Sequence, residues 1–436
     1  MNFLKRIFSN NSSQAPETTF GRNLERIKTE EQLSHWNQAI SSFDQDLYLD
    51  SIDHFFHYLA DINTEHFNFS KQKDKIQFSF VQGSKKIDFI ADELWFRAIV
   101  DIIEVKETNI GLLRKLLESS YKLIYGRYCV KDSNIISIIF DGNVQEASPF
   151  KLFEGLKEIS LRADKEDDLL FVEFPNLNRI HNSFIQETSL SHTSIKYKYY
   201  RQWLERALDT DVRILLDKNR YPGASVFIYL SCFYKIDYLL CPEGKAMDII
   251  EATHRTYFEK KEIDLNTKAF QLEKACHLLL TFTEVQLSIE LYKVYHTFPI
   301  TNLISTKEIA QNIEVEFQAM QWYYDFKHFE VCEAICTYIV GSNFFNYTLP
   351  RVMHELMHLY FELTDPEYFR ELGLECDFNL NSDLIQSSKN LESRCRKIIL
   401  THLKDDKAYD AILIFNTNTR IDLLISFLKF IQNFHY

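Results

Sequence analysis

Glycine and proline are scarce in this chain of 436 residues, which contains 10 Gly and 8 Pro. Both residues interrupt helices and form turns, so their scarcity predicts few turns and long uninterrupted elements. The 8 cysteines form neither a C-x-x-C pair nor a regular disulfide framework, and a chain of this size can bury a core without cross-links. This cysteine usage is typical of a reducing cytoplasm, where we expect the protein to be located.

Long apolar runs and basic stretches are also missing. No run approaches the roughly 20 apolar residues that span a bilayer, so we expect no transmembrane segment. The net charge of −13, without a long Lys/Arg run, produces a field that repels phosphate backbones, so nucleic acid is not an expected partner. No Walker loop, G-x-G-x-x-G or G-x-S-x-G motif occurs in the sequence.

The apolar fraction of 46% is ample for the two or three domains that a chain of this length predicts. We expect residues 1–40 to be an N-terminal arm and linker, because residues 9–19 (SNNSSQAPETT) are polar and lack apolar periodicity. Residues 1–8 (MNFLKRIF) would place four apolar side chains on one face of a short turn, which predicts a weak contact with a membrane surface or a partner. A frayed terminus is the reading we favour there.

Residues 41–185 are predicted to form an α+β domain, because the apolar period changes several times along them. Helical spacing over 43–62 is followed by alternation that predicts strands. Residues 94–105 fit a fourth strand or a short helix equally well. The expected elements are strands at 67–69, 76–80 and 87–89, a helix at 110–125, a strand pair at 127–130 and 135–140, a helix at 149–163, an acidic loop at 164–168 and a strand at 169–174.

This order of elements resembles the small α+β domain of type III secretion chaperones and of the YbjN-like family of bacterial proteins. The likeness covers roughly residues 41–175 and is carried by residues 112–117 (LLRKLL), 125–130 (YGRYCV), 135–140 and the closing helix through Asp164. The resemblance implies a non-enzymatic bacterial protein that holds another polypeptide on the open face and edge of its sheet. The sequence leaves open which strand residues face outward, and Phe78, Phe80 and Phe89 are the candidate partner-binding residues.

Residues 186–436 are predicted to be an all-α domain, an irregular α-solenoid or a helical bundle, because strand signals fade and the few breakers separate helical stretches. No repeat of fixed length is visible, so a regular array is not predicted. Helical arrays offer concave surfaces that suit protein binding. The expected helices, in successive antiparallel pairs, include 245–258, 266–296, 307–324 and 328–340.

Residues 354–358 (HELMH) form the one motif in the sequence that matches a known type of catalytic site. His354 and His358, one helical turn apart, could bind zinc while Glu355 activates a water molecule, as in zinc peptidases. A third ligand would be required, and Glu371 or Glu375 is the candidate. A zinc-dependent metallopeptidase is therefore the alternative function, with zinc as its cofactor.

The position of the motif on its helix favours a different interpretation. An apolar stripe falls on one side of the helix, and the two histidines fall on the other side beside Arg351. Arg351 would pair with Glu355 and repel a divalent cation. We therefore expect both imidazoles to face water, no cofactor, and a scaffold or chaperone-like protein whose partner is another protein. His54 and His57, which lie among acidic residues, are also expected on a solvated helix face.

Overall fold

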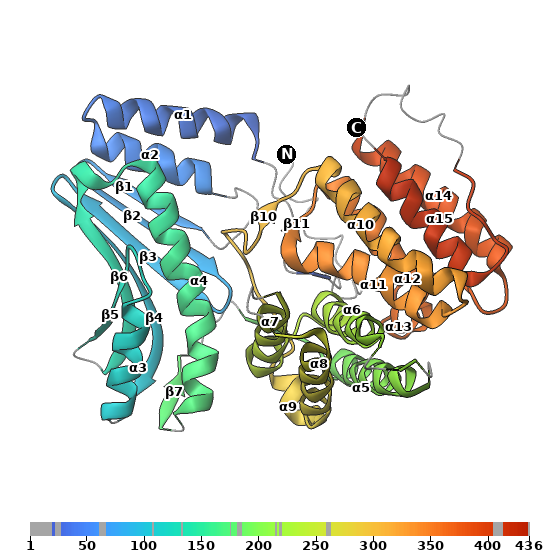
Figure 1. The fold of residues 1–436 in the computed structure, drawn as a ribbon. Helices are drawn as coiled ribbons and strands as arrows, with labels where there is room; N and C mark the ends of the chain where they lie inside the picture. The colour runs from blue at the N-terminus through green and yellow to red at the C-terminus, as the bar shows by residue number, and fades with distance from the viewer. Residues whose placement is uncertain are drawn as a thin grey trace, which may run out of the picture.

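The structure, a computed structural model, describes residues 20–21, 28–60, 67–106, 109–131, 134–174, 176–180, 185–213, 216–217, 220–258, 263–403 and 413–434. Residues 1–8, the expected membrane or partner contact, lie outside the described residues. Within the described ranges, an antiparallel sheet with its helices is followed by a mainly helical region (Figure 1). None of the described helices is long and apolar enough to cross a membrane.

One antiparallel sheet organises the first region, with strand order β1-β2-β3-β4-β6-β5 and β7 paired to β4. The predicted strands at 76–80, 87–89, 127–130 and 135–140 are confirmed, and the ambiguous residues 94–105 form a strand rather than a helix. The strands are β1 (Asn68–Gln72), β2 (Lys75–Gln82), β3 (Lys85–Asp92), β4 (Trp95–Val105), β5 (Arg127–Val130), β6 (Ile135–Asn143) and β7 (Leu177–Arg179).

Four helices accompany the sheet: α1 (Glu30–Asp44), α2 (Tyr48–Leu59), α3 (Ile110–Ser120) and α4 (Pro149–Glu173). Helix α1 begins within the range expected as an arm, because Thr29 and Gln32 form a capping box there. Helix α4 continues through residues 164–173, so the predicted loop and strand are wrong. The helical spacing of its buried residues Leu156, Ile159, Ala163 and Leu170 carries the helix across the acidic run.

Phe78, Phe80 and Phe89 form the core of this region, where their exposed fractions are 3%, 0% and 2%. Helix α2 covers them, and the ring of Phe56 stacks on Phe78 with centroids 4.0 Å apart. The expectation that these three side chains bind a partner is therefore corrected. Alternation shows that a strand has two faces, but the face that receives the helices is decided by chain segments far away in sequence.

The second region is mainly helical, but the all-α expectation is wrong in detail because it contains two short two-stranded sheets. The helix predicted at 266–296 is broken after Leu280 and gives way to strand β9. Its elements are β8 (Gln186–Glu187), α5 (Leu190–Arg213), α6 (Pro222–Leu240), α7 (Gly244–Phe258), α8 (Leu265–Leu280), α9 (Glu284–Ile289), β9 (Tyr292–Lys293), β10 (Asn302–Leu303), α10 (Thr306–Asp325), α11 (Phe329–Asn346), β11 (Tyr347–Thr348), α12 (Arg351–Thr364), α13 (Pro366–Glu371), α14 (Leu384–His402) and α15 (Arg420–Asn433).

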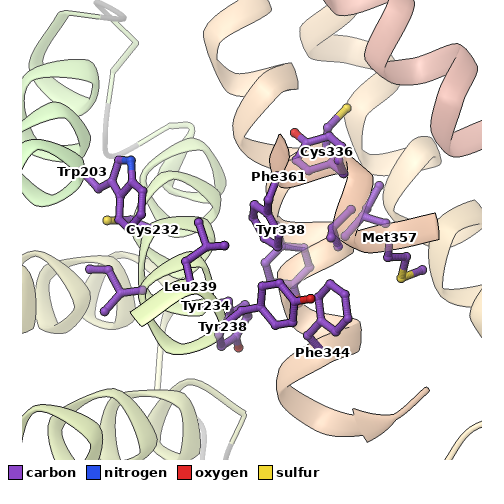
Figure 2. Packing of buried hydrophobic residues seen from close by; sticks show 14 of the residues in the cluster. Trp203, Cys232, Tyr234, Tyr238, Leu239, Cys336, Tyr338, Phe344, Met357 and Phe361 are labelled. Carbon is purple, nitrogen blue, oxygen red and sulfur yellow. The ribbon is translucent and has the colours of Figure 1, made fainter. Parts of the chain in front are cut away.

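Helices α6 and α11 form the centre of the helical region, and both are apolar around most of their circumference. They are not neighbours in the chain, so the helices do not simply pack in successive pairs. Gly341 allows the close approach, because a Cβ atom there would lie 2.7 Å from Cβ of Tyr234. Figure 2 shows aromatic side chains of α6 facing those of α11 and α12, and the Tyr238 ring stacks on Phe344 with centroids 3.8 Å apart.

The two regions are joined by residues 295–298 as well as by the direct connection between β7 and β8. Gly83, in the turn between β2 and β3, donates its N–H to the Tyr295 carbonyl at 2.7 Å. The side-chain oxygen of Gln82 accepts the backbone N–H groups of Thr297 and Phe298, both at 2.8 Å. The ring of Phe298 is then buried in the core of the sheet region. The second half of the chain therefore completes the core of the first.

Gly83→Ala is expected to lower the free energy of unfolding by at least about 1–2 kcal/mol, because a side chain is strained at positive φ. Gly83 has φ +56°, and a Cβ atom would lie 1.9 Å from the Asp164 carboxylate, which accepts the Ser84 N–H. Gly373→Ala is the matched control, with φ +78° and nothing within 4 Å. Urea unfolding should show a larger loss for Gly83→Ala, and equal losses would contradict the steric argument.

Candidate functional site

The two histidines of the HELMH motif lie inside the protein and not on a solvated face. On α12, His354 is 8% exposed, and the side chain of His358 is 20% exposed. The apolar stripe predicted for this helix is buried, but so are Met353, Met357 and Phe361 on its other sides. The expectation that both imidazoles face water is wrong, because parts of the chain distant in sequence cover the polar face as well.

Burial keeps both imidazoles neutral near pH 7. It lowers the pKa of His354 to about 4, and the nearby Arg351 guanidinium adds to the effect. It lowers the pKa of His358 to about 3, with smaller contributions from His354 and Arg394. The charged imidazolium form is disfavoured because burial removes the water that would solvate it.

His358 is held at both ring nitrogens. Its Nδ1 lies 2.9 Å from the Tyr238 hydroxyl, and its Nε2 lies 3.5 Å from a carboxylate oxygen of Glu362. A neutral ring that carries its proton on Nε2 can accept the tyrosine hydroxyl at Nδ1. Arg394 donates to Glu362 at 2.8 Å. His354 differs, because its buried Nε2 has no hydrogen-bond partner among the described residues.

The other residues proposed for a zinc site make contacts with other side chains or lie in solvent. Glu355 bonds to His402 Nε2 at 2.8 Å and lies 3.6 Å from Arg351, which agrees with the expected Arg351 pairing. Glu371 accepts both Lys198, at 2.7 Å, and the Tyr199 hydroxyl, at 2.9 Å, on α5. Glu375 is exposed on the segment after α13. In the part of the chain that the structure describes, no group of three or more His, Cys, Asp or Glu residues is arranged to hold a metal ion.

Residues Phe20 and Gly21 cover the histidines instead. Phe20 is 9% exposed and its ring lies among His358, Phe369, Tyr368 and Tyr238. Gly21 follows directly and donates its N–H to the Tyr238 carbonyl at 2.9 Å. The polar pattern of α12 gave no sign of this contact, because the segment that makes it is more than 300 residues away in sequence. The one local signal was an isolated Phe-Gly in a polar arm.

Exposed apolar side chains gather on α3 and the turn that follows it. Leu112 and Leu116 face the core, while a second stripe at helical spacing faces outward. Its members and their exposed fractions are Ile110 (72%), Leu113 (42%), Leu117 (71%), Tyr121 (93%) and Ile124 (82%). We call these five residues the α3 stripe. The sequence signal was a short helix with apolar residues on opposite sides.

The face of the sheet opposite the phenylalanine core carries a groove of about 490 Å³. Residues that alternate with the core positions line it, including Gln77, Ser79, Ile90 and Ile99. Its two charged lining residues are paired, Asp88 with Lys86 at 2.8 Å and Arg97 with Asp141 at 3.6 Å. A partner would have to break such pairs or leave them in water, so this groove offers less binding energy than the α3 stripe.

His54 and His57 on α2 meet a third histidine that the sequence did not single out, His35 on α1. The Nδ1 atoms of His35 and His54 are 3.0 Å apart, and the ring of His57 stacks on His35. Burial, followed by the neighbouring His35, lowers the pKa of His54. The expectation of a fully solvated face therefore holds for His57 but not for His54, which packs between the two helices.

No protein-family model matches the chain, and a search of curated proteins also finds no match.

Proposed function

We propose that this protein is an intracellular, non-enzymatic binder of another polypeptide, chaperone-like or scaffold-like in role, and that the α3 stripe is its contact surface. The resemblance of residues 41–175 to type III secretion chaperones points to the same class of partner. Cysteine usage supports a cytoplasmic location. The HELMH residues do not enter this proposal, because Glu355 pairs with His402 and the imidazoles are covered.

The α3 stripe is the observation that carries the proposal. A contiguous apolar patch of about 300–600 Å² is the largest that ordinary monomers expose, and patches of that size are often functional. Five large side chains in one stripe, four of them more than 70% exposed, form a patch of this order. Figure 1 places α3 at the outer end of the sheet region, away from the helical region. The stripe is therefore open to a partner approaching from solvent.

The neighbouring edge of the sheet can add main-chain hydrogen bonds. Strand β5 is an end strand of the sheet and pairs with β6 alone among the described strands. Its outward Val130 is 43% exposed. An extended segment of a partner can pair with such an edge while its apolar side chains pack on an adjacent helix. This combination suits an apolar, extended or helical segment of another protein.

Leu117→Asp is expected to weaken partner binding at least tenfold, because it removes about 1.5–3 kcal/mol of apolar burial and places a charge at the interface. The measurement is affinity purification from the native cell with quantitative mass spectrometry, followed by titration of the recovered polypeptide. Ile385→Asp is the matched control, since Ile385 is 62% exposed on the distant helix α14. Both variants should fold normally, as surface substitutions change stability little.

Equal recovery of the same polypeptides by the wild type and both variants would refute the α3 surface. Light scattering of the purified chain provides a second check. If the wild type is a dimer that Leu117→Asp converts to a monomer, the stripe is occupied by a second copy, and the proposed partner is wrong.

A further inference from the structure

Three imidazoles meet between helices α1 and α2. The Nδ1 atoms of His35 and His54 lie 3.0 Å apart, and the ring of His57 stacks on His35 with centroids 4.9 Å apart. Two ring nitrogens at this distance share a single proton, because one must donate and the other must accept. When both imidazoles are charged, each nitrogen carries its own proton and the contact is lost. The His35–His54 contact therefore requires at least one of the two rings to be neutral.

The charged groups beside the rings can compensate one added proton. Asp50 and Asp53 lie on the same helix as His54, and Lys71 on β1 binds both carboxylates, at 3.4 and 2.5 Å. The two carboxylates and the ammonium together carry one net negative charge. His57 is best placed to use it, since its Nε2 lies 3.5 Å from an Asp53 oxygen. A first proton, on His57, is therefore compensated.

A second proton would have to enter the His35–His54 contact. Burial, followed by the neighbouring His35, holds the pKa of His54 below its ordinary value, and Asp53 opposes this shift only in part. On α1, Glu31 lies one turn before His35 but is exposed, so water screens its charge. Acid therefore disfavours the packed arrangement, because an imidazole that stays neutral there can become charged once the helices separate.

Few buried contacts hold α1 in place. Among its apolar side chains only Ala39 is buried. Ser51 on α2 donates to the Ala39 carbonyl at 2.7 Å, and Gln32 on α1 donates to the Ala60 carbonyl at 2.6 Å. A helix of 15 residues is marginal in water without such packing. The free energy that keeps α1 on the domain is therefore small enough for the loss of one contact to matter.

Helix α1 covers aromatic side chains of α2 and α4. The indole ring of Trp36 on α1 lies 4.8 Å from the ring of Tyr58 and 5.2 Å from that of Phe150, measured between centroids. It also lies 6.3 Å from the ring of Phe153. The phenylalanine core of the sheet would stay covered if α1 left, because α2 makes its own contacts with the sheet. Departure of α1 would therefore expose an aromatic surface without opening the core.

We propose that the His35–His54 contact is an acid-sensitive latch, and that protonation of both rings releases α1 and exposes the aromatic surface under Trp36. The inference goes beyond the proposed function and uses no residue of the α3 stripe. An imidazole that is neutral in the latched form and titrates near pH 6.5 when released favours release about tenfold for each pH unit below that value. Release therefore increases as the pH falls and reverses on neutralisation.

Hydrogen exchange of α1 in the full-length chain tests the latch. Between about pH 7.5 and about pH 5.5, the protection factors of α1 peptides, corrected for the intrinsic pH dependence of exchange, should fall about tenfold in the wild type. In His54→Gln the contact no longer titrates, so the fall should shrink to less than about twofold, whatever the protection at neutral pH. His277→Gln, an exposed change on α8, should behave as the wild type. Equal falls in His54→Gln and the wild type would overturn the proposal.

Two further variants keep the result interpretable. His35→Gln removes the other half of the contact and replaces His54→Gln if that chain does not fold. The double variant His354→Gln and His358→Gln removes the two buried imidazoles of α12, whose low pKa values make the helical region acid-sensitive. It should keep the fall in α1 protection. Loss of the fall in this double variant would mean that α1 reports global unfolding, and the latch would be wrong.

Fluorine NMR of the chain labelled with 5-fluorotryptophan provides a second readout. The Trp36 resonance, assigned with Trp36→Phe, should move toward its solvent-exposed position on acidification of the wild type and should stay in place in His54→Gln. A Trp36 resonance that does not respond to acid in the wild type would contradict release of α1.

Discussion

Replacing Phe298 with alanine is expected to lower the free energy of unfolding of the sheet region by about 3–5 kcal/mol, the usual cost of deleting a buried phenylalanine ring. Phe298 is 1% exposed, and its ring centroid lies 5.6 Å from that of Phe80 and 5.3 Å from that of Phe153. The cavity left behind would lie between the sheet and α4. Urea unfolding measures the loss, and hydrogen exchange should accelerate in peptides from β2 and α4.

Phe326→Ala is the control for this prediction, because Phe326 is 62% exposed and contributes little burial. Its loss of stability should stay below about 0.5 kcal/mol, as for most surface substitutions. A loss under about 1 kcal/mol for Phe298→Ala would mean that residues 295–298 do not complete the sheet core. Faster exchange in α11 without any change in β2 would lead to the same conclusion.

Acidification should destabilise the protein strongly between pH 6.5 and pH 4.5, and His354 and His358 are the main reason. In the unfolded chain each imidazole has a pKa near 6.5. In the folded chain burial lowers the pKa to about 4 for His354 and about 3 for His358. Their contribution is therefore fully present above pH 6.5 and is lost as the pH falls toward the folded values. The two together should cost on the order of 5 kcal/mol by pH 4.5.

Urea unfolding over this pH range tests the prediction with the double variant His354→Gln and His358→Gln. The variant should lose much of the pH dependence, whatever its stability at pH 8, because glutamine does not titrate. His277→Gln, an exposed change on α8, should keep the wild-type slope. Burial raises the pKa of Glu362, so its protonation stabilises the folded form at low pH and offsets part of the loss. An unchanged slope in the double variant would show that these imidazoles are not buried in solution.

Much of the secondary structure could be predicted from the sequence because it depends on local period. Alternation located β2 and β3, and helical spacing located α7 and α10 within a few residues. The prediction failed at residues 164–173, where the sequence suggested an acidic loop at 164–168 and a strand at 169–174. Helix α4 persists there because its apolar positions still fall on one face and because Asp164 binds the Ser84 N–H.

The arrangement around the candidate sites could not be predicted, because it depends on contacts between distant segments. Phe78 and Phe89 alternate as strand residues on any sheet, and only the packing of α2 makes them core. The polar face of α12 is covered by Phe20, by Tyr238 on α6 and by Arg394 on α14, all far from it in sequence. The α3 stripe was readable in principle, since a helix this short cannot bury apolar residues on opposite sides against one sheet.

Phe20 is synthesised long before the residues that bury it. The ribosome makes Phe20 about 350 residues before Phe369, which the Phe20 ring contacts. At about 5–20 residues per second, this leaves the Phe20 ring without its contacts for a time on the order of tens of seconds. During that interval the nascent arm presents an unburied phenylalanine to other chains and to molecular chaperones. Burial of Phe20 is thus a late step of folding, because it requires the chain to be made at least through α13.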